Sequence, residues 1–156
     1  MSRAAVAQGY QQVLWLYNDL VTEVGTMNFF ALWELPTGEK ELVTAPLDGT
    51  ILPGVTRASV LDLVRDWGGI KVSEREFSIH DLLQAQQEGR LLEAFGCGTA
   101  CIISPVKLLS YKGQDYKVPL DRDDPAAKAG PLARKLNDTI LAIQYGEIES
   151  PWSVVV

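Results

Sequence analysis

Cysteine and histidine are scarce in this sequence, which contains two cysteines and one histidine among 156 residues. A secreted domain stapled by disulfides normally carries more cysteines, so a reducing compartment is expected. Cys97 and Cys101 are accordingly expected to be free, buried thiols. The single histidine, His80, falls in the first turn of a predicted surface helix, where it is expected to be solvated.

Two further absences narrow the class of protein. No apolar run is long enough to span a bilayer, so no membrane partner is expected. The formal net charge of −6 argues against a nucleic acid or an anionic membrane as the main partner. The sequence also lacks internal repeats, low-complexity tracts and interdomain linkers, and its length suits one domain, residues 1–156.

The patterns that are present predict a mixed α/β fold with a substantial antiparallel sheet component and flanking helices. Strands are predicted at residues 11–17, 20–35, 40–45 and 70–76, with Gly25 as a bulge and residues 36–39 as a hairpin turn. Helices are predicted at residues 3–9, 55–68, 78–90 and 131–146, the third capped by Ser78 and the fourth beginning with Pro131. Residues 91–113 are predicted to run from a helix end through a glycine-rich turn into a strand, and residues 114–120 to complete a hairpin.

The first candidate site is the segment LPGVTR, in which a Pro-Gly turn leads directly into a helix. The free N–H groups of a first helical turn and the helix dipole together attract an anion. Gly54 allows a close approach of the backbone to a ligand, and Thr56 adds a hydroxyl group. The alternative is an ordinary helix cap, in which Thr56 or Ser59 bonds the backbone of its own helix.

The second candidate is FGCGTAC, in which glycines flank a cysteine and a threonine. Successive N–H groups in such a turn can form a nest for an anion. Thr99 offers a hydroxyl group, and Ala100 offers an N–H group without side-chain bulk. The alternative is a tight connection into the next strand.

The third candidate is Glu23, which opens a stretch that is otherwise almost wholly apolar. A carboxylate in such a position acts as a general base, a metal ligand or the partner of a buried cation. The alternative is a residue whose carboxylate reaches solvent at the end of a strand. A metal site is not expected, because no second acid, histidine or cysteine stands at metal-ligand spacing around Glu23.

Two anion-binding turns and one carboxylate suit a ligand with a phosphate at one end and a basic nitrogen at the other. Pyridoxal phosphate is such a ligand. A carboxylate that faces its pyridine nitrogen keeps this nitrogen protonated, and the ring then acts as an electron sink. The three candidates together therefore predict a pyridoxal phosphate site.

The sequence resembles the C-terminal large domain of branched-chain amino acid aminotransferases, which are fold-type IV pyridoxal-phosphate enzymes. The resemblance covers nearly the whole chain and rests on QVLWLY, TEVGTMNFF, LVTAPLDGTILPGVTRASVLDL and EAFGCGTACIISPV. It implies transfer of the amino group of leucine, isoleucine or valine to 2-oxoglutarate, with glutamate as the product. It also implies a homodimer, in the cytoplasm or in mitochondria.

The resemblance implies a role for each residue of the motifs. Glu23 would face the pyridine nitrogen, and Thr26 would lie beside the substrate and the cofactor ring. Val55 and Thr56 would bind the phosphate through N–H groups and the Thr56 hydroxyl. Thr99 would also hold the phosphate, while the N–H groups of the Thr99–Ala100 turn would receive the substrate α-carboxylate.

The sequence departs from the family pattern in one respect that bears on catalysis. The Schiff-base lysine of the family precedes the glutamate motif, whereas none of the seven lysines here precedes Glu23. The small N-terminal domain and the lysine segment are therefore expected to be absent from this chain, and no catalytic residue is assigned. With one wall of the cleft missing, apolar residues at 27–33 and 91–96 are expected to meet water. An alternative reading is a non-catalytic, lysine-less relic that dimerises with a full-length aminotransferase and modulates it.

Overall fold

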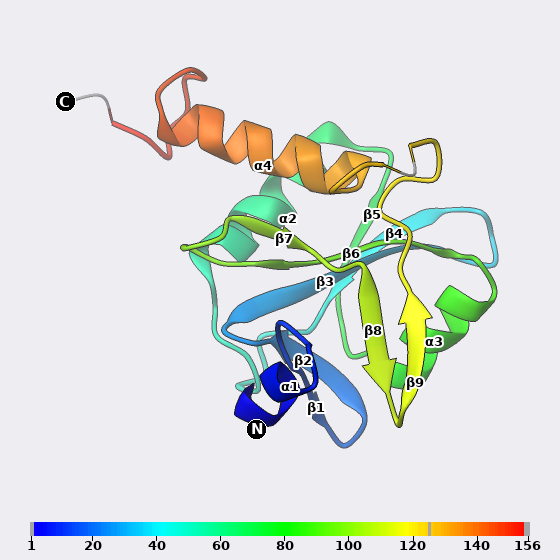
Figure 1. Cartoon of the computed structure of the whole chain (residues 1–156). Helices are drawn as coiled ribbons and strands as arrows, with labels where there is room; N and C mark the ends of the chain where they lie inside the picture. The colour runs from blue at the N-terminus through cyan, green and yellow to red at the C-terminus, as the bar shows by residue number, and fades with distance from the viewer. Residues whose placement is uncertain (1, 125, 155–156) are drawn as a thin grey trace.

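The apolar segment at residues 27–34 forms the central strand in the computed structural model, which describes residues 2–124 and 126–154 (Figure 1). The elements of this part of the chain are, in order, α1 (Ser2–Ala7), β1 (Leu14–Tyr17), β2 (Leu20–Val24), β3 (Met27–Glu34), β4 (Lys40–Thr44), α2 (Val55–Trp67), β5 (Lys71–Glu74), α3 (Ile79–Gln87), β6 (Leu91–Cys97), β7 (Ile103–Pro105), β8 (Leu108–Tyr111), β9 (Gln114–Lys117) and α4 (Pro131–Gln144). The predicted mixed α/β class with a large antiparallel component is confirmed.

Strand β3 has neighbours on both edges. Along one edge it pairs antiparallel with β6, and along the other it pairs first with β2 and then with β4. Strand β1 extends the sheet beyond β2, β5 adds in parallel to β4, and β7 adds to β6. Within the described residues this gives a seven-stranded sheet, beside which β8 and β9 form a separate hairpin.

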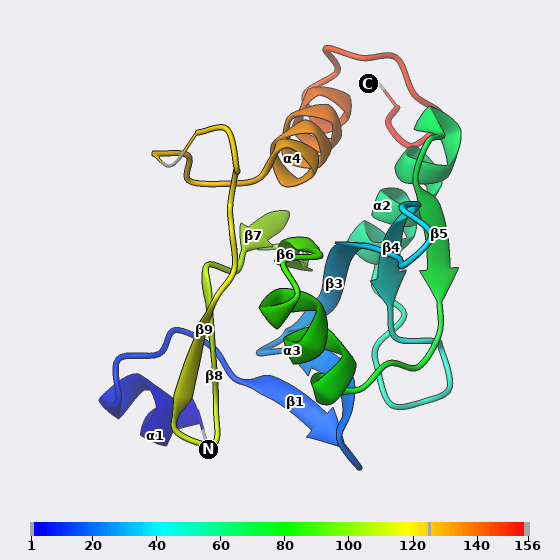
Figure 2. The same ribbon diagram turned by 90° about the vertical axis from the view of Figure 1, so that its right-hand side faces the viewer.

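Successive side chains of β3 enter two different parts of the core. Phe29, Ala31 and Trp33 pack with residues of α3, whereas Phe30 and Leu32 pack with residues of α2 and α4. Figures 1 and 2 show the same arrangement, with α2 and α4 together on one side of the central strands and α3 on the other. A strand covered on both faces reads as a continuous apolar run rather than as an alternating one.

The prediction of one long strand at residues 20–35, with Gly25 as a bulge, is wrong. The segment folds back on itself as the β2–β3 hairpin, in which Glu23 lies opposite Asn28 and Val24 opposite Met27. Gly25 and Thr26 make the turn, and Gly25 has a φ of 61°, a conformation that glycine adopts without steric cost. The glycine therefore reverses the chain rather than kinking a continuous strand.

The prediction of a helix end at residue 91 is also wrong, because residues 91–97 form strand β6. The expected exposure of apolar residues at 27–33 and 91–96 is corrected with it. Most of these side chains are buried, Phe29, Phe30 and Phe95 completely, because α2, α3 and α4 already cover both faces of β3 and β6. The chain thus supplies its own cover for these two strands.

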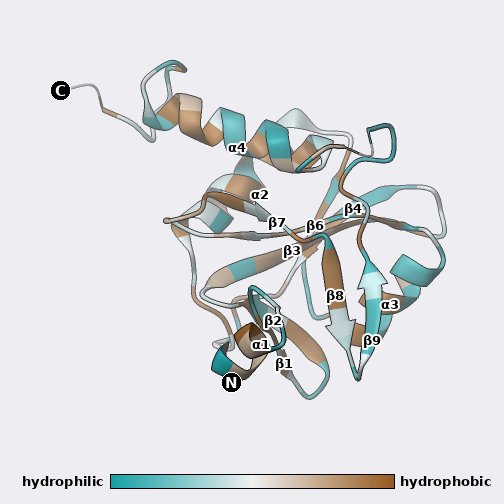
Figure 3. Ribbon diagram, in the orientation of Figure 1, coloured by the Kyte–Doolittle hydropathy of each residue, from teal (hydrophilic) through white to brown (hydrophobic). Residues whose placement is uncertain are grey.

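The helix predictions at residues 55–68, 78–90 and 131–146 are confirmed. Helix α3 begins with a capping box, in which the Ser78 hydroxyl accepts from the Asp81 N–H and the Asp81 carboxylate accepts from the Ser78 N–H. Helix α4 begins with Pro131, and Figure 3 shows hydrophilic and hydrophobic residues interspersed along it. Across residues 2–124 and 126–154, none of the helices has the length and apolar character needed to traverse a bilayer.

Candidate functional site

The three candidate segments meet at one end of the central strands. Glu23 of β2, Asn28 of β3 and Cys97 of β6 occupy one row of the sheet, because Asn28 is the register partner of both others. The β2–β3 turn therefore lies beside the β6–β7 turn, which contains Thr99 and Ala100. This pairing explains how residues more than seventy positions apart in the sequence reach the same place.

Glu23 connects this strand end to the loop that leads into α2. Its Oε1 accepts hydrogen bonds from the Leu52 N–H at 3.0 Å and from Asn28 Nδ2 at 3.3 Å. Asn28 Nδ2 also donates to the Leu52 carbonyl oxygen at 2.8 Å. Within the described residues Glu23 Oε2 accepts no hydrogen bond, so one oxygen of this half-buried carboxylate is available to a ligand.

Helix α2 starts directly beside this network. An added Cβ on its N-cap residue, Gly54, would lie 2.3 Å from Asn28 Oδ1, so the close packing of the two segments requires glycine. Val55 is 82% exposed in the first turn, and Thr56 is half-buried. The start of the helix is thus held against the strands while its first residues face outward.

No side chain among the described residues accepts from the first N–H groups of α2, so these groups are not capped. The alternative reading is met in one part, because the Ser59 hydroxyl donates to the Val55 carbonyl oxygen of its own helix. In the described part of the chain, no hydrogen bond is formed by the N–H groups of Val55, Thr56 and Arg57. By contrast, the Ser78–Asp81 box caps α3, and the Glu93 carboxylate accepts from two N–H groups of α4. The start of α2 is therefore an open cluster of donors.

The β6–β7 turn carries the remaining candidates. Thr99 and Ala100 are exposed, as is Thr26 in the neighbouring β2–β3 turn. The Gly98 N–H donates to the Ile102 carbonyl oxygen at 3.3 Å and closes the turn. An added Cβ on Gly98 would lie 3.1 Å from the Met27 side chain, so the two turns are in close contact.

A cavity of about 750 Å³ adjoins these strand ends and is lined in part by Val24, Met27 and Gly96. A second cavity, of about 430 Å³, lies near the other end of α2, where Trp67 and Gly68 line it. The first cavity is the one that reaches the ends of β2, β3 and β6 where the two turns meet.

In the described part of the chain, the thiols and the His80 side chain form no hydrogen bond with the candidate residues. Both cysteines are free as expected, but only Cys97 is buried, and the expectation of burial is wrong for Cys101. Burial raises the pKa of the Cys97 thiol to about 12, so this residue is not a nucleophile at neutral pH. No cluster of three potential metal ligands occurs in the residues described.

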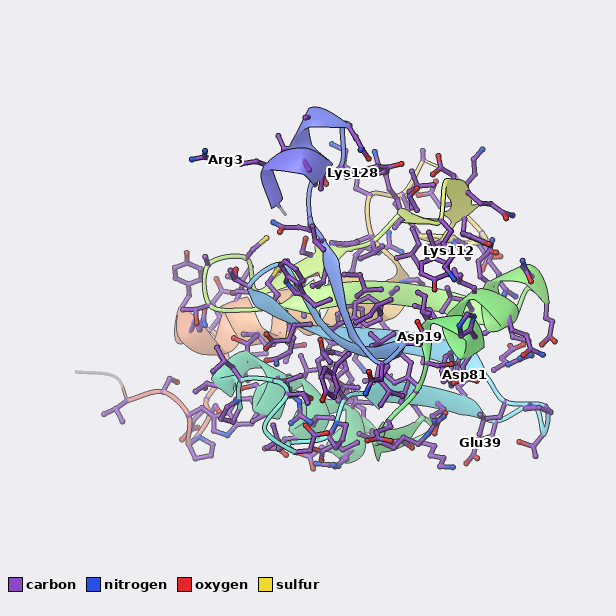
Figure 4. The ribbon with its side chains drawn as sticks, turned by 90° about the horizontal axis from the view of Figure 1, so that it is seen from below. Arg3, Asp19, Glu39, Asp81, Lys112 and Lys128 are labelled. Atoms are coloured by element: carbon purple, nitrogen blue, oxygen red, sulfur yellow. The ribbon has the colours of Figure 1, made fainter. Side chains whose placement is uncertain are left out.

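His80 is exposed, as expected, and its Nε2 lies 3.5 Å from Asp19 Oδ2. Figure 4 shows Asp19 near Asp81 at the start of α3. The Ile79 N–H also donates to the Asp19 carbonyl oxygen. The His80 ring also lies 6.1 Å from the Tyr111 ring of β8, so its contacts join the β1–β2 turn, α3 and β8.

Two residues that support the site were not identified from the sequence. Asn28 is a buried amide within an apolar strand, and this polar residue among aromatic neighbours was the available signal. Arg57 is a buried cation in the first turn of α2, where a positive charge is unfavourable. It donates to the Ala45 carbonyl oxygen at 2.9 Å and to Glu74 Oε2 at 2.8 Å.

Comparison with known proteins places the chain in a family. The family model for class IV amino-transferases matches residues 1–109, and the chain belongs to this family. The branched-chain-amino-acid aminotransferase of Dictyostelium discoideum is 54% identical over 153 residues, which cover 97% of this chain and 40% of that protein. The cytosolic enzyme of Mus musculus is 47% identical over 152 residues, covering 96% and 38%. A mitochondrial relative from Schizosaccharomyces pombe is 49% identical over 158 residues, covering 97% and 36%.

Solved structures support the same fold. The branched-chain amino acid aminotransferase from Escherichia coli superimposes with a TM-score of 0.72 at 27% identity, covering 97% of this chain and 44% of that one. The enzyme from Thermobaculum terrenum in its PLP form superimposes with a TM-score of 0.68 at 27% identity, covering 94% of this chain and 41% of that one. The chain spans about two fifths of the length of the relatives that it matches.

Proposed function

We propose that the chain forms the cofactor-facing part of a pyridoxal-phosphate-dependent branched-chain amino acid aminotransferase. The proposed reaction moves the amino group of leucine, isoleucine or valine to 2-oxoglutarate and yields glutamate. The observation that carries the proposal is the convergence of Glu23, the uncapped start of α2 and the Thr99–Ala100 turn at one end of the sheet.

The residues present fit pyridoxal phosphate. The N–H groups of Val55 and Thr56, with the hydroxyls of Thr56 and Thr99, would bind the phosphate. The unbonded Oε2 of Glu23 would accept a hydrogen bond from the protonated pyridine nitrogen, while its Oε1 stays anchored to Leu52. When bound, the cofactor supplies an electron sink for the bonds at the substrate Cα.

The substrate would lie at the two neighbouring turns. Thr26 would contact it beside the cofactor ring, and the N–H groups of the Thr99–Ala100 turn would receive its α-carboxylate. Both turns are exposed and in contact through Gly98 and Met27, which supports a shared binding role. We further propose a homodimer and a cytosolic or mitochondrial location, the two compartments that the names of the relatives give.

A second candidate function, a non-catalytic partner of a full-length aminotransferase, follows from the positions of the lysines. None of them precedes Glu23. Lys40 pairs with Glu34, six residues along β3 from Asn28, a separation of about 20 Å in a strand. Lys71 pairs with Glu41 at the same far end of the sheet. The two functions differ in whether the gene supplies a lysine that reaches Glu23, so the coding sequence upstream distinguishes them.

The proposal is tested by calorimetric titration with pyridoxine 5′-phosphate and pyridoxine. Both ligands lack the aldehyde, so they form no imine with surface lysines. The chain is expected to bind the phosphate ester at least about tenfold more tightly, because the N–H groups of α2 hold a dianion. Equal affinity for the two ligands would reject the phosphate site.

The same titration tests Glu23. Glu23→Gln is expected to weaken both ligands by about tenfold and to leave their ratio unchanged, because both carry the pyridine nitrogen. The matched control is Glu34→Gln, since Glu34 is also half-buried but lies at the other end of β3. Unchanged binding by Glu23→Gln would reject the assignment of the pyridine contact.

A further inference from the structure

Arg57 occupies a position that is unfavourable for a cation in two respects. It lies in the first turn of α2, at the positive end of the helix dipole, where acidic residues are the stabilising choice. It is also only 3% exposed, and removing a guanidinium from water is costly unless its charge is fully compensated. Such a local conflict between sequence and structure is typical of functional positions.

The compensation of this charge is incomplete. Arg57 shares its carboxylate partner with Arg65, because Glu74 accepts from Arg57 at 2.8 Å through one oxygen and from Arg65 at 2.7 Å through the other. Arg65 has a second carboxylate partner, Asp62 Oδ1 at 3.8 Å, whereas Arg57 pairs with Glu74. Arg57 Nε is buried and has no hydrogen-bond partner within the described residues. One buried donor of the Arg57 guanidinium therefore lacks an acceptor in the described part of the chain.

The same contacts also anchor this turn. The guanidinium donates to the Ala45 carbonyl oxygen just beyond β4 and to Glu74 at the end of β5. The positive charge of Arg57 acts as far as the end of β6, because it opposes the effect of burial on the pKa of Cys97. The strand end that carries the Thr99 turn therefore lies within the electric field of Arg57.

We propose that Arg57 is a positioning residue that makes the start of α2 selective for a phosphate dianion. Its buried charge adds to the field of the helix dipole, and its hydrogen bonds to Ala45 and Glu74 fix the donor N–H groups in place. A bound dianion adds negative charge near this guanidinium, which shares Glu74 with Arg65. This inference rests on the proposed cofactor site and goes beyond it, because Arg57 is not among the residues proposed to touch the cofactor or the substrate.

The test is the ratio of the dissociation constants of pyridoxine and pyridoxine 5′-phosphate, measured by calorimetry on the whole chain. Arg57→Gln is expected to lower this ratio about tenfold by weakening only the phosphate ester. Arg57→Lys keeps the charge and is expected to retain a ratio within about threefold of the wild-type value. A purely structural role would weaken both ligands alike and leave the ratio unchanged, which would overturn the inference.

Arg65→Gln is the matched control. Arg65 shares the same carboxylate but lies two helical turns farther along α2, with its side chain 47% exposed. This variant is expected to leave the ratio unchanged. A fall equal to that of Arg57→Gln would assign the effect to the Glu74 pairing and would overturn the role of Arg57.

Glu74→Gln keeps the inference testable if Arg57→Gln does not fold. Removing the compensating negative charge is expected to raise the ratio severalfold, because the field of Arg57 is then less opposed. An unchanged or lower ratio would overturn the inference. If the wild-type chain itself shows no preference for the phosphate ester, the proposed function fails instead, so the two failures are distinguishable.

Discussion

Replacement of Glu41 by glutamine tests how far one buried carboxylate supports the far end of the sheet. Glu41 lies on β4 and is 1% exposed. Its two oxygens accept four hydrogen bonds, from Trp33 Nε1 at 2.7 Å, from Ser73 Oγ at 2.6 Å and from Arg75 at 2.8 and 3.2 Å. Glutamine has one acceptor oxygen and one NH2 group, so the donors that now bond to the second carboxylate oxygen would face N–H groups.

The expected loss of stability is about 2–3 kcal/mol, from the lost hydrogen bonds to buried donors and the uncompensated Arg75. The pKa of Glu41 gives a consistent magnitude. Burial alone would raise it, but hydrogen bonds from Arg75, Ser73 and Trp33 lower it from 4.5 to about 2. That shift corresponds to roughly 3 kcal/mol at most, and the 45% exposure of the Arg75 side chain reduces it by solvent screening.

The sign of the pH dependence follows from the lowered pKa. The folded state favours the ionised carboxylate, so the contribution of Glu41 is complete above about pH 5 and is lost as the pH falls towards 2. The difference in unfolding free energy between the wild type and Glu41→Gln is therefore expected to shrink over this range. Protonation removes from the wild type the same charge that the substitution removes.

Urea unfolding followed by far-ultraviolet circular dichroism at pH 7, 5, 4 and 3 measures this difference. Glu39→Gln is the matched control, because Glu39 is exposed two residues away and lies at the edge of the molecule in Figure 4. Its effect is expected to stay within about 0.5 kcal/mol at every pH. A loss below about 0.5 kcal/mol for Glu41→Gln, or a loss that is equal at pH 7 and pH 3, would refute the reasoning.

Three further predictions concern other parts of the molecule. Gly54→Ala places a Cβ 2.3 Å from Asn28 Oδ1, so the free energy of unfolding is expected to fall by about 1–3 kcal/mol. The same variant is expected to bind pyridoxine 5′-phosphate more weakly in calorimetry. Burial raises the pKa of Glu93, so the stability deficit of Glu93→Gln in urea is expected to narrow as the pH rises above 4.5. Borohydride reduction with pyridoxal phosphate is expected to label no single lysine of this chain stoichiometrically, and one fully labelled lysine in a peptide map would contradict this.

The sequence predicted the helices better than it predicted the strands. Helices α2, α3 and α4 each bury one face, so their apolar residues recur at helical spacing. Strands β3 and β6 are buried on both faces and show no alternation. The turn at Gly25 and the strand at residues 91–97 were therefore missed, because both depend on the tertiary contacts of these strands.

The candidate site was predictable to a similar extent. Glu23, Gly54 and Thr99 stand out in the sequence by residue type and by their neighbours. Asn28 and Arg57 act through contacts with Leu52 and Glu74, residues 24 and 17 positions away, which no local pattern reveals. The sequence thus nominated the residues expected to touch a ligand, and their roles stay a prediction, whereas the residues that hold them in place required the structure.

The pairing of β3 with β6 also has a kinetic consequence. Phe30 lies opposite Phe95, so about 65 residues of chain must close into a loop before the β6–β7 turn reaches the β2–β3 turn. Helix α2 forms from local contacts, but the neighbours that complete the anion site arrive only with this long-range pairing. The proposed binding of pyridoxine 5′-phosphate is therefore expected to be one of the last properties to appear during refolding, and its recovery after dilution from urea should lag behind the recovery of helical signal.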